Sequence, residues 1–250
     1  MLYLDRLSAW FRPVSSNSSN TPLSRLPLFD PRQIPVESVD SHLPAVPLAS
    51  LQPAALRQRF TQPPAWTPEL LAEKKFSDRA PLHASVLVPI VMREQPTVLL
   101  TERTMHLSSH SGQIAFPGGK ADDEDADASA TALREAQEEV GLDPAFVQVL
   151  GVMPHYLTGS AFIVTPVVAL VQPGFTLTPN AHEVADVFEV PLQFLMNPAH
   201  HQRHIFEWQG VRREWFSMPY QDHTDGRVVQ RFIWGATAGM LRNFYRLLSA

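Results

Sequence analysis

The sequence predicts an α+β fold, arranged as an α/β/α sandwich around a mixed β-sheet. From residue 84 onward, short apolar segments rich in β-branched residues are interspersed with two long helical patterns, which is typical of a sheet covered by helices. The first 80 residues hold many prolines and no long regular pattern. With 250 residues, 44% of them hydrophobic, the chain can bury a full core. We therefore expect a Pro-rich extension over residues 1–80 and one folded domain over residues 81–250.

The extension is predicted to contain only short helices, at Leu2–Phe11, Ala54–Phe60 and Pro68–Lys75. The first of these is amphipathic, as a membrane-surface anchor would be, but its charge is not basic. Docking on the domain or on a partner is therefore the favoured interpretation. No apolar run approaches the length of a membrane span, and the first residues lack the basic region and apolar core of a secretion signal. We expect a cytoplasmic location.

The domain is predicted to contain several strands and two long helices, the second of which is a closing helix at Thr237–Leu248. Residues 84–92 and 97–101 are apolar and β-branched and are joined by a short polar turn, which is typical of a hairpin. Pro166 has no backbone N–H, so its strand is expected to lie at an edge or to carry a bulge. The other expected strands are Gln113–Phe116, Val147–Val152, Ile163–Val171, Val187–Val190 and Gln230–Trp234, with a second hairpin at His204–Trp208 and Val211–Phe216.

The other long helix is predicted to end at Gly141, which sits where a left-handed residue would close it. Its residues are strong helix formers, and Asp125 or Asp127 could cap its start. Three glutamates, Glu135, Glu138 and Glu139, share one face of this helix. At about 100° per residue they fall within an arc of roughly 100°, opposite an apolar stripe that can be buried.

Clustered carboxylates repel one another, and a solvated helix face would usually balance them with lysines. Here Arg134 is the only cation within the last two turns of the helix. The cluster also follows a glycine turn at Gly118–Gly119. Mg²⁺ prefers oxygen ligands and can bridge phosphate oxygens. This pattern favours a site that holds a divalent metal ion against phosphate over an ordinary acidic surface.

Residues Gly119–Leu142 resemble the Nudix box. Its usual pattern is Gly, five residues, Glu, seven residues, Arg-Glu, an apolar residue, any residue, Glu-Glu, any residue, Gly and an apolar residue. The half from Arg134 to Leu142 is complete, with Ala136 in the first apolar position. The first half departs from the pattern, because Asp125 stands where Glu is usual and eight residues separate it from Arg134.

The preceding segment, Leu99–Gly119, is similar to the signature of the coenzyme A pyrophosphatase branch of Nudix hydrolases. It contains Leu-Leu-Thr-Glu-Arg-Thr, then Leu107, and His110 followed by Ser-Gly-Gln-Ile-Ala-Phe-Pro-Gly-Gly. That branch commonly carries the same Asp and the same extra residue in its box. Weaker similarity follows at Phe162–Val168, Glu183–Leu192 and Ile233–Ala238, so the resemblance covers roughly residue 80 to the C-terminus. It implies a Nudix hydrolase domain with the Nudix α/β/α fold.

The resemblance also implies hydrolysis of the diphosphate bond of coenzyme A or its thioesters, with Mg²⁺ or Mn²⁺ as the cofactor. The products would be adenosine 3′,5′-bisphosphate and 4′-phosphopantetheine or its acyl form. Two alternatives stay open: a Nudix hydrolase for another nucleoside diphosphate derivative, such as a dinucleotide or nucleotide sugar, and a catalytically silent module that binds a nucleotide to regulate something. The Leu99–Gly119 signature argues against the first, and the intact box glutamates argue against the second. A homodimer is left open.

By similarity to the family, Glu135 and Glu139 are assigned to the metal ion, with the carbonyl of Gly119 as a third ligand. Glu138 is assigned a bridging or water-positioning role, and Arg134 an ion pair that orients the glutamates. The general base is expected on a later loop, where Glu183 matches best, and Glu138 is the competing candidate. The substrate side is expected to be lined by Arg103, His110, Gly112 and Gln113, although the last two could simply shape the turn.

Composition narrows the other function classes. A formal charge of -5 and a pI near 6.0 argue against a nucleic-acid-binding surface. The absence of cysteine excludes disulfides, thiolate zinc sites and a cysteine nucleophile. An anionic substrate needs local cations, for which Arg103, Arg134 and Lys120 are candidates. The acidic loop Asp122–Asp125 could bind further metal, but a solvated loop before a helix is the favoured interpretation.

Overall fold

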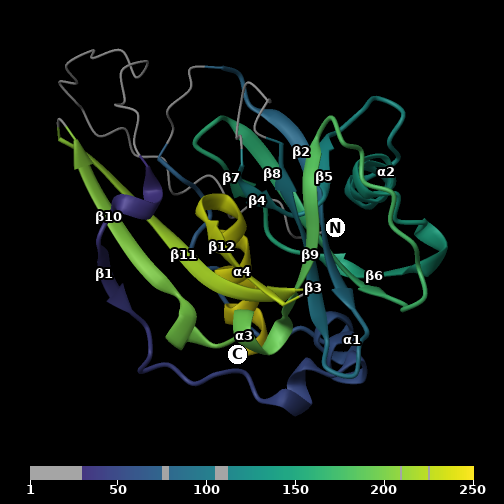
Figure 1. Cartoon of the computed structure of the whole chain (residues 1–250), viewed down its shortest axis with the longest axis horizontal. Helices are drawn as coiled ribbons and strands as arrows, with labels where there is room; N and C mark the ends of the chain where they lie inside the picture. Colours follow the sequence, from purple (N-terminus) through teal and green to yellow (C-terminus); the bar gives the residue numbers. More distant parts are fainter. Residues whose placement is uncertain (1–29, 75–78, 105–111, 209, 225) are drawn as a thin grey trace, which may run out of the picture.

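The computed structural model describes residues 30–74, 79–104, 112–208, 210–224 and 226–250. Its strands form two sheets, of which the central one is mixed (Figure 1). In the central sheet β2 (Leu82–Val91) and β8 (Phe162–Val171) pair in parallel along their whole length. The remaining strands of this sheet are β3 (Thr97–Arg103), β4 (Ile114–Ala115), β5 (Gly118–Lys120), β6 (Val147–Val152), β7 (Tyr156–Leu157) and β9 (Val184–Pro191), all paired antiparallel.

The second sheet is antiparallel and was not distinguished from the first by the sequence pattern. Its order is β1, β10, β11, β12, with bounds Val36–Val39, Gln202–Trp208, Val211–Thr224 and Arg227–Trp234. The helices of the described residues are α1 (Pro53–Thr61), α2 (Ala128–Val140), α3 (Leu192–Leu195) and α4 (Gly235–Leu248), with short 3-10 turns at 31–33, 48–51, 144–146 and 198–200. Both predicted hairpins and both predicted long helices are confirmed.

Successive residues of the central strands point into two different hydrophobic clusters, because side chains alternate across a strand. Leu87 and Leu99 lie in the cluster that contains the apolar face of α2. Their neighbours Val88 and Leu100 lie in the opposite cluster, with α4 and residues of the second sheet. Figure 1 shows α2 beside one face of the central sheet and α4 between the two sheets. The predicted α+β fold, a mixed sheet covered on both faces, is confirmed.

The described part of the extension packs onto this core. Val46, Leu51 and Leu56 are buried in the cluster that contains α4, and β1 pairs with β10. The helix predicted at Ala54–Phe60 is confirmed as α1. The segment Leu2–Phe11, for which docking was the favoured interpretation, lies outside the described residues.

One predicted helix is wrong, and Pro166 lies not at a sheet edge but at an irregularity of the ladder, the other alternative predicted for it. No helix forms over 68–74, the described part of Pro68–Lys75, because the N–H groups of Glu69 and Leu70 donate to Asn243 Oδ1 at 2.9 and 3.0 Å. Pro166 lies in an interior strand, between β2 and β6. It is tolerated there because β6 ends opposite Val167 and β7 begins beyond the proline, so only the Pro166 carbonyl is used on that side, by Met153 N–H at 2.8 Å.

Buried arginines join the layers. Arg231 of β12 contacts Glu102 of β3 at 2.8 Å, Asp186 of β9 at 2.5 Å and Asp222 of β11 at 3.0 Å, and its guanidinium lies 4.1 Å from the Phe188 ring centroid. These contacts connect the second sheet to the central one. No helix within the described residues is long and apolar enough to cross a membrane.

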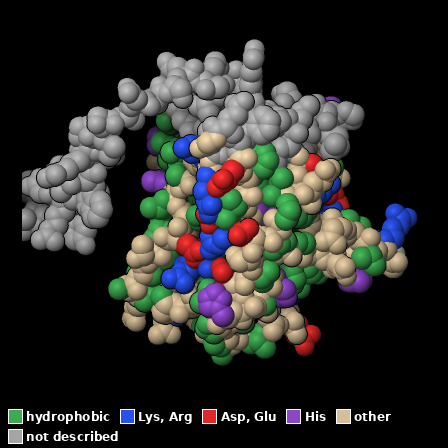
Figure 2. Space-filling view, turned by 90° about the vertical axis from the view of Figure 1, so that its left-hand side faces the viewer, with side chains coloured by type: hydrophobic (Ala, Val, Ile, Leu, Met, Phe, Trp, Pro, Cys, Tyr) green, Lys and Arg blue, Asp and Glu red, His purple; other side chains and the backbone are tan. Residues whose placement is uncertain are grey.

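A band of basic and acidic side chains crosses the face where β1 and β10 lie (Figure 2). Among the ion pairs of this region, Glu69 accepts from Arg203 of β10 at 2.9 Å and from Arg242 of α4 at 2.7 Å. Arg242 also pairs with Asp40 at 2.8 Å. The extension is therefore connected to both β10 and α4 through charged side chains.

Candidate active site

The predicted box helix is α2, and its ends are closed as expected. Asp127 is the N-cap, and its Oδ1 accepts from the Ala130 N–H at 2.8 Å. Gly141 ends the helix with φ +70°, a left-handed conformation that an added side chain would strain. The apolar side of α2 packs on the central sheet, and its acidic side faces Gly118–Gly119. These glycines were expected to form a turn but belong to strand β5.

Glu139 is the most enclosed of the three box glutamates. Its Oε2 accepts from the Gly118 N–H at 3.0 Å, and its Oε1 lies 3.5 Å from the Arg103 guanidinium. Burial raises the pKa of Glu139 to about 7, against the lowering effects of the Gly118 hydrogen bond and of Arg103. The sequence predicted that this side chain lies on an acidic helix face, but it could not show that the backbone of Gly118 covers it.

Glu135 lies directly against Gly119 of β5. A Cβ added to Gly119 would fall 2.3 Å from Glu135 Oε2 and 2.4 Å from its Cδ, so only glycine leaves room for this carboxylate. Burial raises the pKa of Glu135, while Arg134 opposes that effect. The backbone of Gly119 and the Glu135 carboxylate are therefore in close contact, as a shared metal site would require.

Arg134 forms ion pairs with two of the box glutamates and also with Asp125. Its guanidinium donates to both oxygens of Asp125, at 3.0 and 2.9 Å, and its Nη1 lies 3.1 Å from Glu135 Oε1 and 3.1 Å from Glu138 Oε2. The Arg134 hydrogen bonds hold the pKa of Asp125 well below its usual range. Asp125, the residue that departs from the usual box, thus fixes Arg134 from the opposite side to the glutamates.

The later-loop carboxylate is brought to the same place. The negative charge of Glu183 contributes to raising the pKa of both Glu135 and Glu139. Its loop is fixed by two backbone contacts: the Asn180 N–H donates to the Glu139 carbonyl at 2.8 Å, and the Thr104 N–H donates to the Glu183 carbonyl at 3.0 Å. The Glu138 side chain, by contrast, is 60% exposed and turned to Arg134.

The substrate-side residues are partly brought together. The Gly112 N–H donates to the Arg103 carbonyl at 3.1 Å and the Arg103 N–H to the Gln113 carbonyl at 3.0 Å, so Gly112, with φ +64°, shapes the turn through its backbone. The side chains of Arg103 and Gln113 line a pocket. His110 lies outside the described residues.

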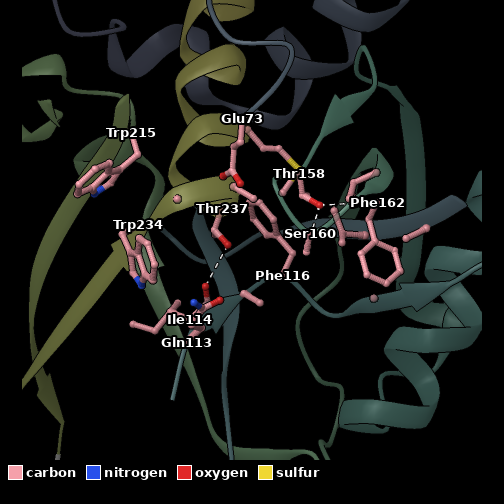
Figure 3. Close-up of a pocket in the computed structure, with 18 of the residues that line it drawn as sticks. Glu73, Gln113, Ile114, Phe116, Thr158, Ser160, Phe162, Trp215, Trp234 and Thr237 are labelled. Carbon is pink, nitrogen blue, oxygen red and sulfur yellow. Dashed lines mark hydrogen bonds between the residues drawn. The ribbon is translucent and has the colours of Figure 1, made fainter. Parts of the chain in front are cut away.

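That pocket has a volume of about 370 Å³ and opens beside the acidic cluster, since Gly118, Gly119 and Lys120 form part of its wall. Figure 3 shows it between the β11–β12 side, with Trp215 and Trp234, and the β7–β8 side, with Thr158, Ser160 and Phe162. The sequence analysis assigned no site role to Glu73, Trp215, Trp234 or Thr237, which line the pocket. Trp234 and Thr237 lie in Ile233–Ala238, a segment of weaker family similarity, whereas no local pattern marked Glu73 or Trp215.

The donor set fits a hard divalent cation. No group of three or more Asp, Glu or His side chains in the described part of the chain is arranged to hold a metal ion unaided. Glu135 and Glu139 nevertheless present carboxylate oxygens against the Gly118–Gly119 backbone, in a setting where burial and the charge of Glu183 disfavour bare negative charge. Mg²⁺ suits such a site, because it usually keeps several waters and takes substrate phosphate oxygens as further ligands.

Comparison with known proteins agrees with this geometry. Residues 81–224 match the family model of the NUDIX domain. The fold and the box thus define a Nudix hydrolase, and the chain belongs to this family of pyrophosphohydrolases.

The curated relatives include "Uncharacterized Nudix hydrolase NudL" of Escherichia coli K12, 45% identical over 160 residues, which span 64% of this chain and 79% of the relative. The protein of the same name from Shigella flexneri is 44% identical over 169 residues, 66% of this chain and 83% of the relative.

Among solved structures, the binary complex of Caenorhabditis elegans Ap4A hydrolase has a TM-score of 0.39 and 18% identity, covering 44% of this chain and 80% of its own. A MutT/nudix family protein from Enterococcus faecalis has a TM-score of 0.40 and 14% identity, and the match covers 79% of this chain and 74% of that protein.

Proposed function

We propose that this Nudix hydrolase cleaves the diphosphate bond of coenzyme A or its thioesters, with Mg²⁺ or Mn²⁺ as the cofactor. The products are adenosine 3′,5′-bisphosphate and 4′-phosphopantetheine, or its acyl form. The observation that carries the substrate is the pocket beside Gly118 and Gly119. Its walls combine apolar side chains such as Phe116 and Met240 with neutral hydrogen-bonding groups such as Thr158 and Ser160. A long neutral arm with amide groups, which pantetheine supplies, matches that lining.

Glu135, Glu139 and the Gly119 carbonyl would hold the metal ion. When bound there, such an ion neutralises phosphate charge and lowers the pKa of a coordinated water. Arg134 keeps the Glu135 and Glu138 carboxylates in place through its ion pairs. Arg103, which lines the pocket, supplies positive charge next to Glu139 where an anionic substrate must approach.

Glu183 is the better supported general base. The negative charge of Glu183 contributes to raising the pKa of both proposed metal ligands, whereas Glu138 is exposed and forms an ion pair with Arg134. A carboxylate at that position can take the proton of the attacking water if it is within hydrogen-bond reach. Glu183→Gln is expected to lower kcat by about 100-fold or more while Mn²⁺ affinity stays near the wild-type value. A larger loss for Glu138→Gln than for Glu183→Gln would transfer the role to Glu138.

The direct test is incubation of the purified protein with coenzyme A and Mg²⁺ or Mn²⁺, with product identification. Adenosine 3′,5′-bisphosphate and 4′-phosphopantetheine are expected, and Glu139→Gln should abolish their formation. Glu124→Gln, which removes the same charge from the exposed acidic loop, is the matched control and should be fully active. Turnover of a dinucleotide or nucleotide sugar in place of coenzyme A would overturn the substrate. Nucleotide binding without any turnover would instead indicate a silent module.

A further inference from the structure

One side of the pocket is closed by a short segment that precedes the NUDIX match, which we call the strap (residues 69–74). It is attached to β7 by two hydrogen bonds of 2.8 Å, from Leu157 N–H to the Leu71 carbonyl and from Glu73 N–H to the Leu157 carbonyl. It is attached to α4 by Asn243, whose side-chain oxygen accepts from two strap N–H groups. The strap is therefore a fixed wall of the pocket.

The strap directs one carboxylate, that of Glu73, into the pocket wall. Figure 3 shows Glu73 on the opposite side of the pocket from Gln113 and Ile114. Glu73 Oε2 accepts from the Gly159 N–H at 2.9 Å, and the Tyr156 hydroxyl is hydrogen-bonded to the same carboxylate. These contacts orient the Glu73 carboxylate, which can accept hydrogen bonds at both of its oxygens.

The surroundings of Glu73 already compensate its charge. Arg213 of β11 lines the same pocket; burial lowers its pKa, and the nearby charge of Glu73 opposes that effect. A Cβ added to Gly235, the first residue of α4, would lie 3.7 Å from Glu73 Oε1, which places the carboxylate near the positive end of that helix. Burial, together with Glu73, raises the pKa of Tyr156 well above its usual range, so its hydroxyl stays a donor.

We propose that Glu73 is a specificity-determining residue that accepts a hydrogen bond from a neutral N–H or O–H group of the substrate, on the part beyond the diphosphate. An ammonium group is a poorer match, because Arg213 and Lys74 line the same pocket. A second phosphate is also a poorer match, because it would face a carboxylate. If the proposed function holds, on which this naming of the group rests, the donor is an amide or hydroxyl of the pantetheine arm.

Glu73→Gln tests this, because the amide keeps the shape of the side chain, removes its charge and replaces one acceptor oxygen with a donor. Loss of a hydrogen bond to a charged group is expected to raise KM for coenzyme A about tenfold or more, with kcat within about twofold of wild type. By calorimetry, 4′-phosphopantetheine should bind about tenfold more weakly to the variant, while adenosine 3′,5′-bisphosphate binds as before. Leu71→Ala, an exposed strap residue outside the pocket lining, is the matched control and should change neither.

The outcomes separate the two proposals. Equal KM and equal 4′-phosphopantetheine affinity in wild type and Glu73→Gln, with coenzyme A hydrolysed, would overturn the role of Glu73 alone. If the wild type hydrolyses another diphosphate and not coenzyme A, the proposed function fails, and KM is then compared on that substrate. A raised KM with unchanged kcat still supports Glu73 as a contact, and an unchanged KM overturns it. A fall in kcat shared with Leu71→Ala would show that the strap acts only as a support.

Discussion

His201 is expected to make the stability of the folded chain fall between pH 7 and pH 5. It is fully buried, and its ring nitrogens have fixed roles. Nε2 lies 2.8 Å from the Leu195 carbonyl, which can only accept, so Nε2 carries the proton. Nδ1 lies 3.2 Å from the Arg242 guanidinium, which can only donate, so Nδ1 must be bare. Protonation of Nδ1 would place two cations against each other inside the protein.

The size of the effect follows from the shift in pKa. Burial lowers the pKa of His201 to about 4 from its ordinary value of 6.5, with Arg242 adding to the effect, while the Leu195 hydrogen bond and Asp40 oppose it. Between pH 7 and pH 5 the unfolded chain binds nearly a full proton at this position and the folded chain does not. The free energy of unfolding therefore has its full value above the pKa of His201 in the unfolded chain. It decreases as the pH falls below that value, by about 2 kcal/mol at pH 5.

The assay is urea unfolding of the wild type and of His201→Gln at pH 7 and pH 5. Gln can still donate to the Leu195 carbonyl but cannot titrate, so its own pH dependence should be smaller by about 2 kcal/mol. Other titrating groups are common to both proteins and cancel in this double difference. If the two proteins lose the same free energy of unfolding between the two pH values, the assignment of a neutral His201 with a bare Nδ1 is refuted.

Four further substitutions are predicted from close contacts in the structure. Gly119→Ala should lower hydrolysis about tenfold or more and change stability by less than about 1 kcal/mol, because the added Cβ displaces only the flexible Glu135 carboxylate; wild-type activity would contradict the placement of that ligand. Gly118→Ala should instead destabilise the fold by about 3 kcal/mol, because Gly118 has φ +154° and an added Cβ would lie 2.4 Å from the Ser85 carbonyl oxygen. An unchanged melting temperature would argue against this strain. Arg231→Met should lower the free energy of unfolding by about 3 kcal/mol, since three carboxylates lose their shared cation; a loss below about 0.5 kcal/mol in urea unfolding would contradict this. Asn243→Ala should lower it by about 2 kcal/mol through lost hydrogen bonds to the strap, and should also raise KM, which steady-state kinetics would check.

The acidic half of the site could be predicted from the sequence because it depends on local spacing. Helical periodicity places Glu135 and Glu139 on one face, and the position of Gly141 predicts where α2 ends. The strands could be predicted for the same reason, since alternating apolar residues and β-branched residues are local signals. What periodicity could not give is the depth at which Glu139 lies, because that depends on the Gly118 backbone folding over it.

The pocket could not be predicted, because its walls come from residues far apart in the chain. Glu73 and Trp234 line the same pocket although about 160 positions separate them. The wrong helix at Pro68–Lys75 has the same origin. Its residues have adequate helical propensity, but the Asn243 side chain from the far end of the chain takes their N–H groups, and tertiary contacts override propensity.

Part of the pocket wall lies outside the stretch of chain that carries the acidic cluster. The box residues lie within the NUDIX match, whereas Glu73 precedes it and Trp234 and Thr237 follow it. If Glu73 has the proposed role, mutations in these flanking residues would alter which diphosphate is accepted without changing the residues that would cleave it.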